Sequence, residues 1–129
     1  MTEFNWPSLR VSALDVSARA YVPYSHYPVG AAALADDGRV VTGCNVENAA
    51  YGVVLCAECG VISSLVAGGG GRLLAFTCCD AAGAVITPCG RCRQLLWEHG
   101  GPDLLLDTPS GILPLSALLP QAFGPDNLA

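Results

Sequence analysis

Two short segments carry the residue types best suited to metal chemistry. Residues 56–58 read Cys-Ala-Glu at the expected start of a helix, and residues 88–92 read Pro-Cys-Gly-Arg-Cys ahead of another. Three thiolates can occupy three corners of a tetrahedral zinc site and leave the fourth open for water. Glu58 would then be placed to take a proton from that water and pass protons to a substrate nitrogen and a leaving amine. The pattern predicts a hydrolytic zinc enzyme with Cys56, Cys89 and Cys92 as ligands.

Cys59 supports a competing interpretation. Together with Cys56 it forms a second Cys-x-x-Cys pair, and four thiols would make a closed structural zinc site. Two observations favour the open site. The gap from Cys59 to Cys89 is longer than the roughly 15–20 residues usual between such pairs, and the first pair opens a long apolar helix. A dithiol redox pair is a third alternative, but it needs only one of the two pairs.

Composition and charge narrow the function class. The chain has 129 residues, enough for one domain spanning 1–129, and it is 52% hydrophobic but only 13% charged. This surplus of apolar residues favours association with further copies of the chain. The net charge is −5 and there is no basic patch, so we expect a small neutral substrate and no nucleic-acid partner.

The same data bear on location. No apolar stretch reaches the roughly 18 residues of a membrane span, and no signal-peptide pattern opens the chain. The odd count of seven cysteines argues against a secreted disulfide scaffold. We therefore expect a cytoplasmic protein without membrane contact, in which Cys44, Cys78 and Cys79 are buried strand thiols.

The elements that must position the two segments alternate between helix and strand. Helical periodicity begins near Ser8, which is expected to cap the first helix, and an Asp-Gly turn at 36–38 predicts a hairpin. Expected helices cover 8–20, 56–67, 90–98 and 116–119; expected strands cover 29–35, 39–45, 73–79, 104–106 and a stretch near 112–113. Alternation of this kind indicates an α/β layered domain.

Taken together, these motifs resemble the cytidine deaminase family in its small, homotetrameric branch. The likeness rests on segment 56–58 with segment 88–94, and it extends to 24–32, 45–51 and 118–125, which is nearly the whole chain. The resemblance implies a three-layer α/β/α fold around a mixed sheet of about five strands. It also implies one Zn²⁺ per subunit and the hydrolytic deamination of cytidine and 2′-deoxycytidine to uridine and 2′-deoxyuridine in pyrimidine salvage.

The resemblance also implies residue roles. Cys56, Cys89 and Cys92 would bind zinc, and Glu58 would be the proton carrier. Asn45 and Glu47 would hold the ribose hydroxyls. Substrate contacts would further come from Tyr27 and the backbone of Ala57 at the base, and from Tyr51 and Phe123 in a neighbouring subunit's pocket.

Two positions depart from the family pattern. Tyr27 stands where many members have phenylalanine, and Cys59 stands where many tetrameric members have an arginine that offsets the negative charge of the thiolates. We expect backbone N–H groups at the two helix starts, with the Cys59 thiol or Arg91, to take over that task.

Other functions stay open at this point. A related deaminase of another aminopyrimidine, such as blasticidin S, would share the zinc motifs. A structural zinc or interaction module would have four protein ligands. Editing of RNA or DNA is disfavoured by the acidic charge.

Overall fold

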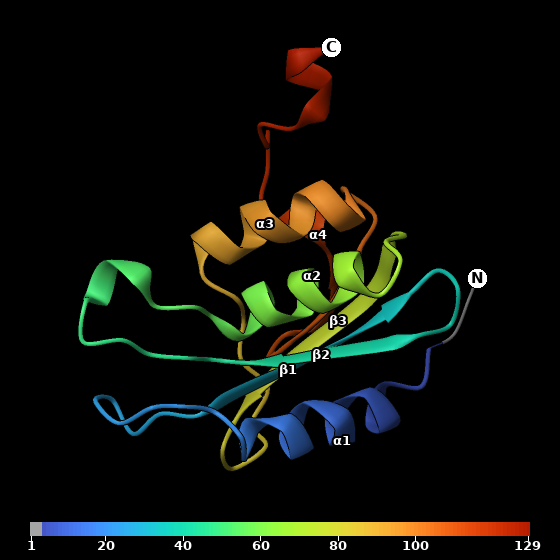
Figure 1. Ribbon diagram of the computed structural model, residues 1–129. Helices are drawn as coiled ribbons and strands as arrows, with labels where there is room; N and C mark the ends of the chain where they lie inside the picture. Colours follow the sequence, from blue (N-terminus) through green and yellow to red (C-terminus); the bar gives the residue numbers. More distant parts are fainter. Residues whose placement is uncertain (1–3) are drawn as a thin grey trace.

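The fold is a five-stranded mixed sheet with helices on both faces (Figure 1). It is seen in a computed structural model that describes residues 4–129. The strands are β1 (Val29–Ala35), β2 (Val40–Cys44), β3 (Leu73–Asp80), β4 (Leu105–Thr108) and β5 (Gly111–Pro114), in the order β2-β1-β3-β4-β5. Only β3 and β4 are parallel; the other neighbours are antiparallel. The predicted α/β fold with about five strands is confirmed.

The helices are α1 (Trp6–Ser17), α2 (Ala57–Ala67), α3 (Gly90–Gly100) and α4 (Leu115–Leu118), with 3-10 turns at Tyr51–Val53 and Pro125–Leu128. Helix α1 covers one face of the sheet, and α2 with α3 covers the other, as Figure 1 shows. None of the helices within residues 4–129 has both the length and the apolar character needed to span a membrane.

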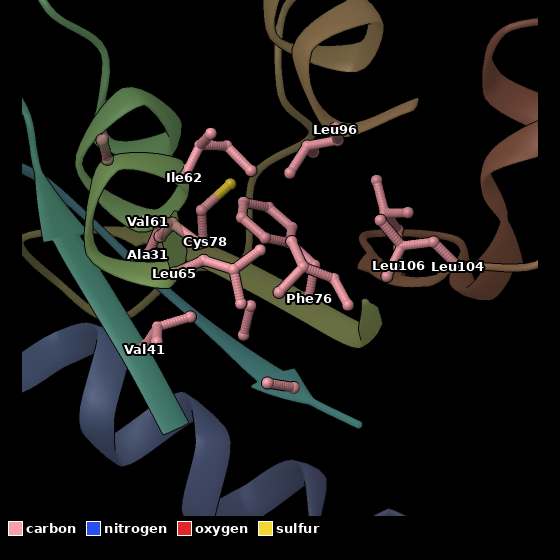
Figure 2. Close-up of a cluster of buried hydrophobic side chains, with 14 of the residues drawn as sticks. Ala31, Val41, Val61, Ile62, Leu65, Phe76, Cys78, Leu96, Leu104 and Leu106 are labelled. Atoms are coloured by element: carbon pink, nitrogen blue, oxygen red, sulfur yellow. The ribbon is translucent and has the colours of Figure 1, made fainter. Parts of the chain in front are cut away.

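Alternation along the two central strands builds a separate core on each face. Ala31 and Ala33 of β1 join the core under α2 and α3, whereas Ala32 packs with Leu9 and Ala13 of α1. Phe76 and Cys78 of β3 point toward the side chains of α2 (Figure 2). The small side chains of β1 let the helices approach the sheet closely, and a strand buried on both faces reads as a continuous apolar run.

The first helix begins earlier than the sequence indicates. Asn5, not Ser8, is the N-cap: its Oδ1 accepts a hydrogen bond from the backbone N–H of Ser8 at 3.1 Å. Pro7 lies in the first turn, where its missing N–H costs nothing, so the helix is already under way when Ser8 is reached. The helix also ends at Ser17, not Ala20. The other predicted boundaries agree with the observed ones to within two residues, and those of β1 agree at both ends.

Two glycines bring the N-terminal half of α2 onto the sheet. A Cβ on Gly43 of β2 would lie 2.3 Å from the carbonyl oxygen of Ala57, and one on Gly60 would lie 3.0 Å from the Gly43 Cα. Backbone therefore packs on backbone at this crossing, which leaves no room for a side chain. Because Ala57 and Gly60 flank Glu58, this contact sets the position of the first turn of α2.

Candidate zinc and substrate site

Three predicted ligands come together at the starts of two helices. The sulfur atoms of Cys56, Cys89 and Cys92 all lie within 4.8 Å of one another. Cys56 is the N-cap of α2, Cys89 is the N-cap of α3, and Cys92 lies in the first turn of α3. Helix N-termini present free N–H groups and positive dipole ends, which favour thiolates. The donor set is thus three sulfur atoms, which suits zinc with one coordination position left open.

The three thiols differ in acidity because their surroundings differ. The pKa of Cys89 lies below its ordinary value, chiefly because the backbone N–H of Cys92 donates to its sulfur. Burial raises the pKa of Cys92, and the Glu58 carboxylate beside it raises that pKa further. Burial also raises the pKa of Cys56. In the metal-free chain, zinc must therefore displace protons from Cys56 and Cys92 before all three can act as thiolate ligands.

A cation lies on this cluster, as the sequence suggested. Arg91 Nη1 is 3.8 Å from the sulfur of Cys56, within reach of a weak N–H···S hydrogen bond. The pKa of Arg91 is raised, first by the charge of Cys59 and then by that of Cys56. Arg91 thus stands where it can offset part of the negative charge of the thiolates, without an arginine at position 59.

Cys59 is directed elsewhere. It is not part of the three-sulfur cluster, and it lines a groove of about 570 Å³ between α2 and α3 that Arg91 also lines. Within residues 4–129, the only cluster of metal-binding side chains is the one with three cysteines. This arrangement does not support a closed four-cysteine site.

Glu58 is buried beside the cluster. It lies in the first turn of α2 and is only 4% exposed. Its carboxylate contributes to the raised pKa of both Cys92 and Cys78, although burial is the larger cause for each thiol. A carboxylate in this position can exchange protons with a reactant at the cluster while bulk water is kept away.

Asn45 and Glu47 hold the loop that precedes β1. The Asn45 side chain accepts from the N–H of Val29 at 2.9 Å and donates to the carbonyl of Tyr27 at 3.0 Å. Glu47 Oε1 accepts from the N–H groups of Tyr24 and Ser25, both at 3.1 Å. Hydrogen bonds from Ser25, and then from Tyr24, lower the pKa of Glu47. Both residues therefore shape the loop that carries Tyr27, whose side chain is 49% exposed.

A cavity of about 320 Å³ opens beside Glu47. It is lined by Tyr24, Ser25, Glu47, Asn48, Tyr51 and Val54. Tyr51 and Glu47 were predicted from the sequence to contact substrate, whereas Tyr24 and Asn48 were not. The tyrosine-rich loop 21–28 was the only sequence signal for Tyr24, and nothing in its pattern singled out one tyrosine.

Phe123 is not brought to this cavity. It lies in the C-terminal segment, which Figure 1 shows extending beyond α3 and away from the sheet. Its side chain is 59% exposed, and that of Tyr51 is 79% exposed. Within one chain, the structure therefore unites the zinc ligands with Glu58, and Glu47 with Tyr51, but leaves Phe123 apart.

Comparison with known proteins agrees with this geometry. The family model described as the cytidine and deoxycytidylate deaminase zinc-binding region matches residues 8–106, which include all three cysteines and Glu58. The chain belongs to the cytidine deaminase family. It is therefore a zinc-dependent hydrolase of the deaminase class, and the Cys56–Cys89–Cys92 cluster suits its one zinc ion.

Relatives of this deaminase match over nearly the whole chain. A cytidine deaminase of Mycobacterium tuberculosis (strain ATCC 25618 / H37Rv) is 59% identical over 99% of this chain and 96% of its own length. A crystal structure of the cytidine deaminase from M. tuberculosis superposes with a TM-score of 0.92 at 60% identity, covering 95% of this chain and 99% of that one. The enzyme from Mycobacterium leprae gives a TM-score of 0.91 at 55% identity, covering 92% and 100%.

Proposed function

We propose that this deaminase converts cytidine and 2′-deoxycytidine to uridine and 2′-deoxyuridine, with release of ammonia, as a step of pyrimidine salvage in the cytoplasm. The observation that carries the proposal is the meeting of three cysteine sulfurs beside a buried glutamate at the starts of α2 and α3. The mycobacterial relatives, which are named as cytidine deaminases, support the choice of substrate.

The reaction replaces the amino group on C4 of the base by an oxygen atom from water. Zinc held by Cys56, Cys89 and Cys92 would supply Lewis acidity and make a coordinated water nucleophilic near neutral pH. Glu58 would take one proton from the water and deliver it to the ring nitrogen next to C4. It would then carry the second proton of that water, from the hydroxyl group now on C4, to the leaving amine. Its burial keeps the carboxylate at the reacting atoms and away from bulk water.

Substrate binding would use the cavity beside Glu47 and the loop 21–28, which carries Tyr27. An amide and a carboxylate are well suited to a ribose diol, which assigns the hydroxyls to Asn45 and Glu47. Glu47 already accepts two backbone N–H groups, but a carboxylate has further acceptor capacity. Tyr27 would lie against the base, and the backbone of Ala57 would hydrogen-bond its edge.

Partner subunits would complete each pocket. Tyr51 and Phe123 are both exposed aromatic side chains on segments that project from the sheet. We infer a homotetramer in which these two residues cover the substrate site of a neighbour. The exposed apolar groups Val53 and Leu55, next to Tyr51, would be covered in the same contact.

A direct assay tests the reaction. Loss of the cytidine absorbance band and release of ammonia are measured together with zinc content, for the natural protein and for Glu58→Gln. We expect turnover only in the natural protein, with equal zinc in both. Deoxycytidine, blasticidin S and cytidine 5′-phosphate are assayed in parallel, and activity on blasticidin S with none on cytidine would overturn the substrate assignment.

A mixing experiment tests the shared site. Glu58→Gln and Phe123→Ala variants are coexpressed, and mixed assemblies are isolated with two affinity tags. If Phe123 acts in a neighbour's pocket, some pockets in the mixed assembly combine an intact Glu58 with an intact Phe123, so activity at cytidine concentrations below KM exceeds the average of the two variants. Activity equal to the average of the two would place Phe123 in its own subunit's site.

A further inference from the structure

Helix α3 serves two segments of the chain at once. Its start carries Cys89 and Cys92, which face the zinc cluster. The next two residues bind the C-terminal segment: Arg93 Nη1 donates to the carbonyl of Leu118 at 2.9 Å, and Gln94 Nε2 donates to the carbonyl of Phe123 at 2.8 Å. Arg93 Nε also donates to the carbonyl of Pro88 at 2.8 Å, directly before Cys89.

A third contact lies one turn further along α3. Gly124 is buried, and a Cβ at this position would lie 2.7 Å from Nε1 of Trp97 and 3.2 Å from its Cδ1. The indole therefore occupies the space that any other residue at 124 would need. Beyond it, the Gly124 N–H donates to Oδ1 of Asn127 at 2.8 Å, which turns the chain into the last 3-10 element.

These contacts fix the backbone on both sides of Phe123 while its ring stays exposed. The carbonyl of Phe123 is held by Gln94 and the following residue packs on Trp97, yet the side chain is 59% exposed. An exposed aromatic side chain on a fixed backbone contributes nothing to its own core. It does lower the entropy lost when the ring is buried against a partner.

We propose that Gln94 and the Trp97–Gly124 contact are positioning elements that aim Phe123 at the substrate pocket of a second copy of this chain. The proposal rests on the proposed role of Phe123 in a neighbouring subunit. Helix α3 then holds two zinc ligands of its own subunit, and it also positions Phe123 in the substrate pocket of the neighbouring subunit. The substrates affected are pyrimidine nucleosides, and the effect is on their binding, because neither Gln94 nor Trp97 is a zinc ligand.

The test compares Gln94→Ala, Gly124→Ala and Phe123→Ala in the zinc-loaded protein. For each, kcat and KM for cytidine, zinc content and assembly mass are measured, together with hydrogen exchange of residues 119–124. Losing one hydrogen bond or the packed turn should raise KM about three- to tenfold. Zinc content and kcat should stay close to those of the natural protein, and exchange at 119–124 should become faster.

A double variant and a control separate positioning from general damage. Combining Gln94→Ala with Phe123→Ala should raise KM no further than Phe123→Ala alone, because the amide acts through the ring. Leu128→Ala removes another exposed apolar group of the tail, beyond these contacts, and should leave KM unchanged.

The outcomes distinguish this inference from the proposed function. If Phe123→Ala raises KM but Gln94→Ala and Gly124→Ala do not, the positioning role is wrong and the proposed function stands. If Phe123→Ala itself leaves KM unchanged while the natural protein deaminates cytidine, the shared site and the positioning role are both overturned.

Discussion

Arg91 Nη1 lies 3.8 Å from the sulfur of Cys56, so the helix that carries two zinc ligands also places a cation on the third. The family resemblance implied an arginine at the position of Cys59 for this purpose. Here the two residues line the same groove between α2 and α3. In this chain the cation beside the thiolates is therefore carried by α3.

Replacing Arg91 by methionine should reduce turnover while zinc is retained. Without the cation the thiolates carry more negative charge, and the reacting water loses its proton less readily. We expect kcat to fall about tenfold and the acid limb of the pH–rate profile to move to higher pH. Adding Cys59→Arg should restore much of the loss, and Arg19→Met, at an exposed arginine after α1, serves as a control. An unchanged profile in Arg91→Met would contradict the role.

Zinc content separates the ligand cysteines from Cys59. Cys59→Ala should keep the zinc content of the natural protein, because Cys59 is outside the three-sulfur cluster. Cys56→Ala should lose most of its zinc under the same dialysis, since only two sulfur donors remain. Metal analysis by emission spectroscopy and mass determination provide the comparison. Equal loss in both variants would restore the four-cysteine site and remove the open position.

In the zinc-free protein, the cysteines should react with iodoacetamide in a definite order. The pKa of Cys89 is lowered and its side chain is exposed, whereas burial raises the pKa of Cys92 and Cys78. The thiolate is the nucleophile, so Cys89 should be labelled first and at lower pH than an ordinary thiol. Peptide mass mapping between about pH 6 and 9 measures the rates. Bound zinc should protect Cys89, and labelling of Cys92 before Cys89 would contradict the assignment.

The buried Asp107 should make stability depend on Arg10. Its carboxylate accepts from Arg10 Nε at 2.7 Å and Nη2 at 3.0 Å, and from Thr77 Oγ1 at 3.0 Å. Arg10→Met leaves a buried charge without its partner and should lower the free energy of unfolding by about 3 kcal/mol. Thr77→Val removes one hydrogen bond and should cost about 1 kcal/mol.

The matched control for this pair is the double variant Arg10→Met with Asp107→Asn. It removes the buried charge together with its partner and should be less destabilised than Arg10→Met alone. Thermal unfolding of the zinc-loaded proteins, all at the same protein concentration, ranks the variants by stability. The conditions are kept equal because stability depends on bound metal and on assembly. An equal loss of stability in the single and double variants would mean that the unpaired Asp107 carboxylate does not destabilise the protein when Arg10 is removed.

Two glycine substitutions should have different effects on zinc binding: one should weaken it and the other should leave it unchanged. Gly43→Ala places a Cβ 2.3 Å from the carbonyl of Ala57 and must push the start of α2 off the sheet. We expect weaker zinc binding and a loss of about 2 kcal/mol in stability. Gly90 lies between Cys89 and Cys92 in the sequence, but a Cβ added by Gly90→Ala would have no atom within 4 Å. This variant should keep its zinc affinity and gain up to about 1 kcal/mol.

Zinc titration against a competing chelator checks this pair. Unchanged zinc affinity in Gly43→Ala would mean that the crossing of α2 over β2 does not position Cys56.

The sequence by itself determined the elements and the chemistry of the zinc ligands. Apolar runs between turn residues predicted the strands, the Asp-Gly turn predicted the β1–β2 hairpin, and thiol spacing predicted the metal. These signals are local: each depends on a few neighbouring residues, and the structure differs from them mainly at element ends. The cap of α1 was missed because Asn5 and Ser8 are both good capping residues, and only the proline between them favours the earlier start.

The tertiary structure shows why Cys59 stands apart from the three cysteines of the zinc cluster. Cys56 and Cys59 have equal chemistry, and their spacing alone allowed both to bind zinc. The contact between Gly43 and Gly60 fixes how α2 lies on the sheet, and in that position Cys56 joins Cys89 and Cys92 while Cys59 lines the groove beside Arg91. The proximity of Arg91 to Cys56 and the hydrogen bonds from α3 to the C-terminal segment also depend on the tertiary structure. They join residues far apart in the chain, and no local pattern encodes such contacts.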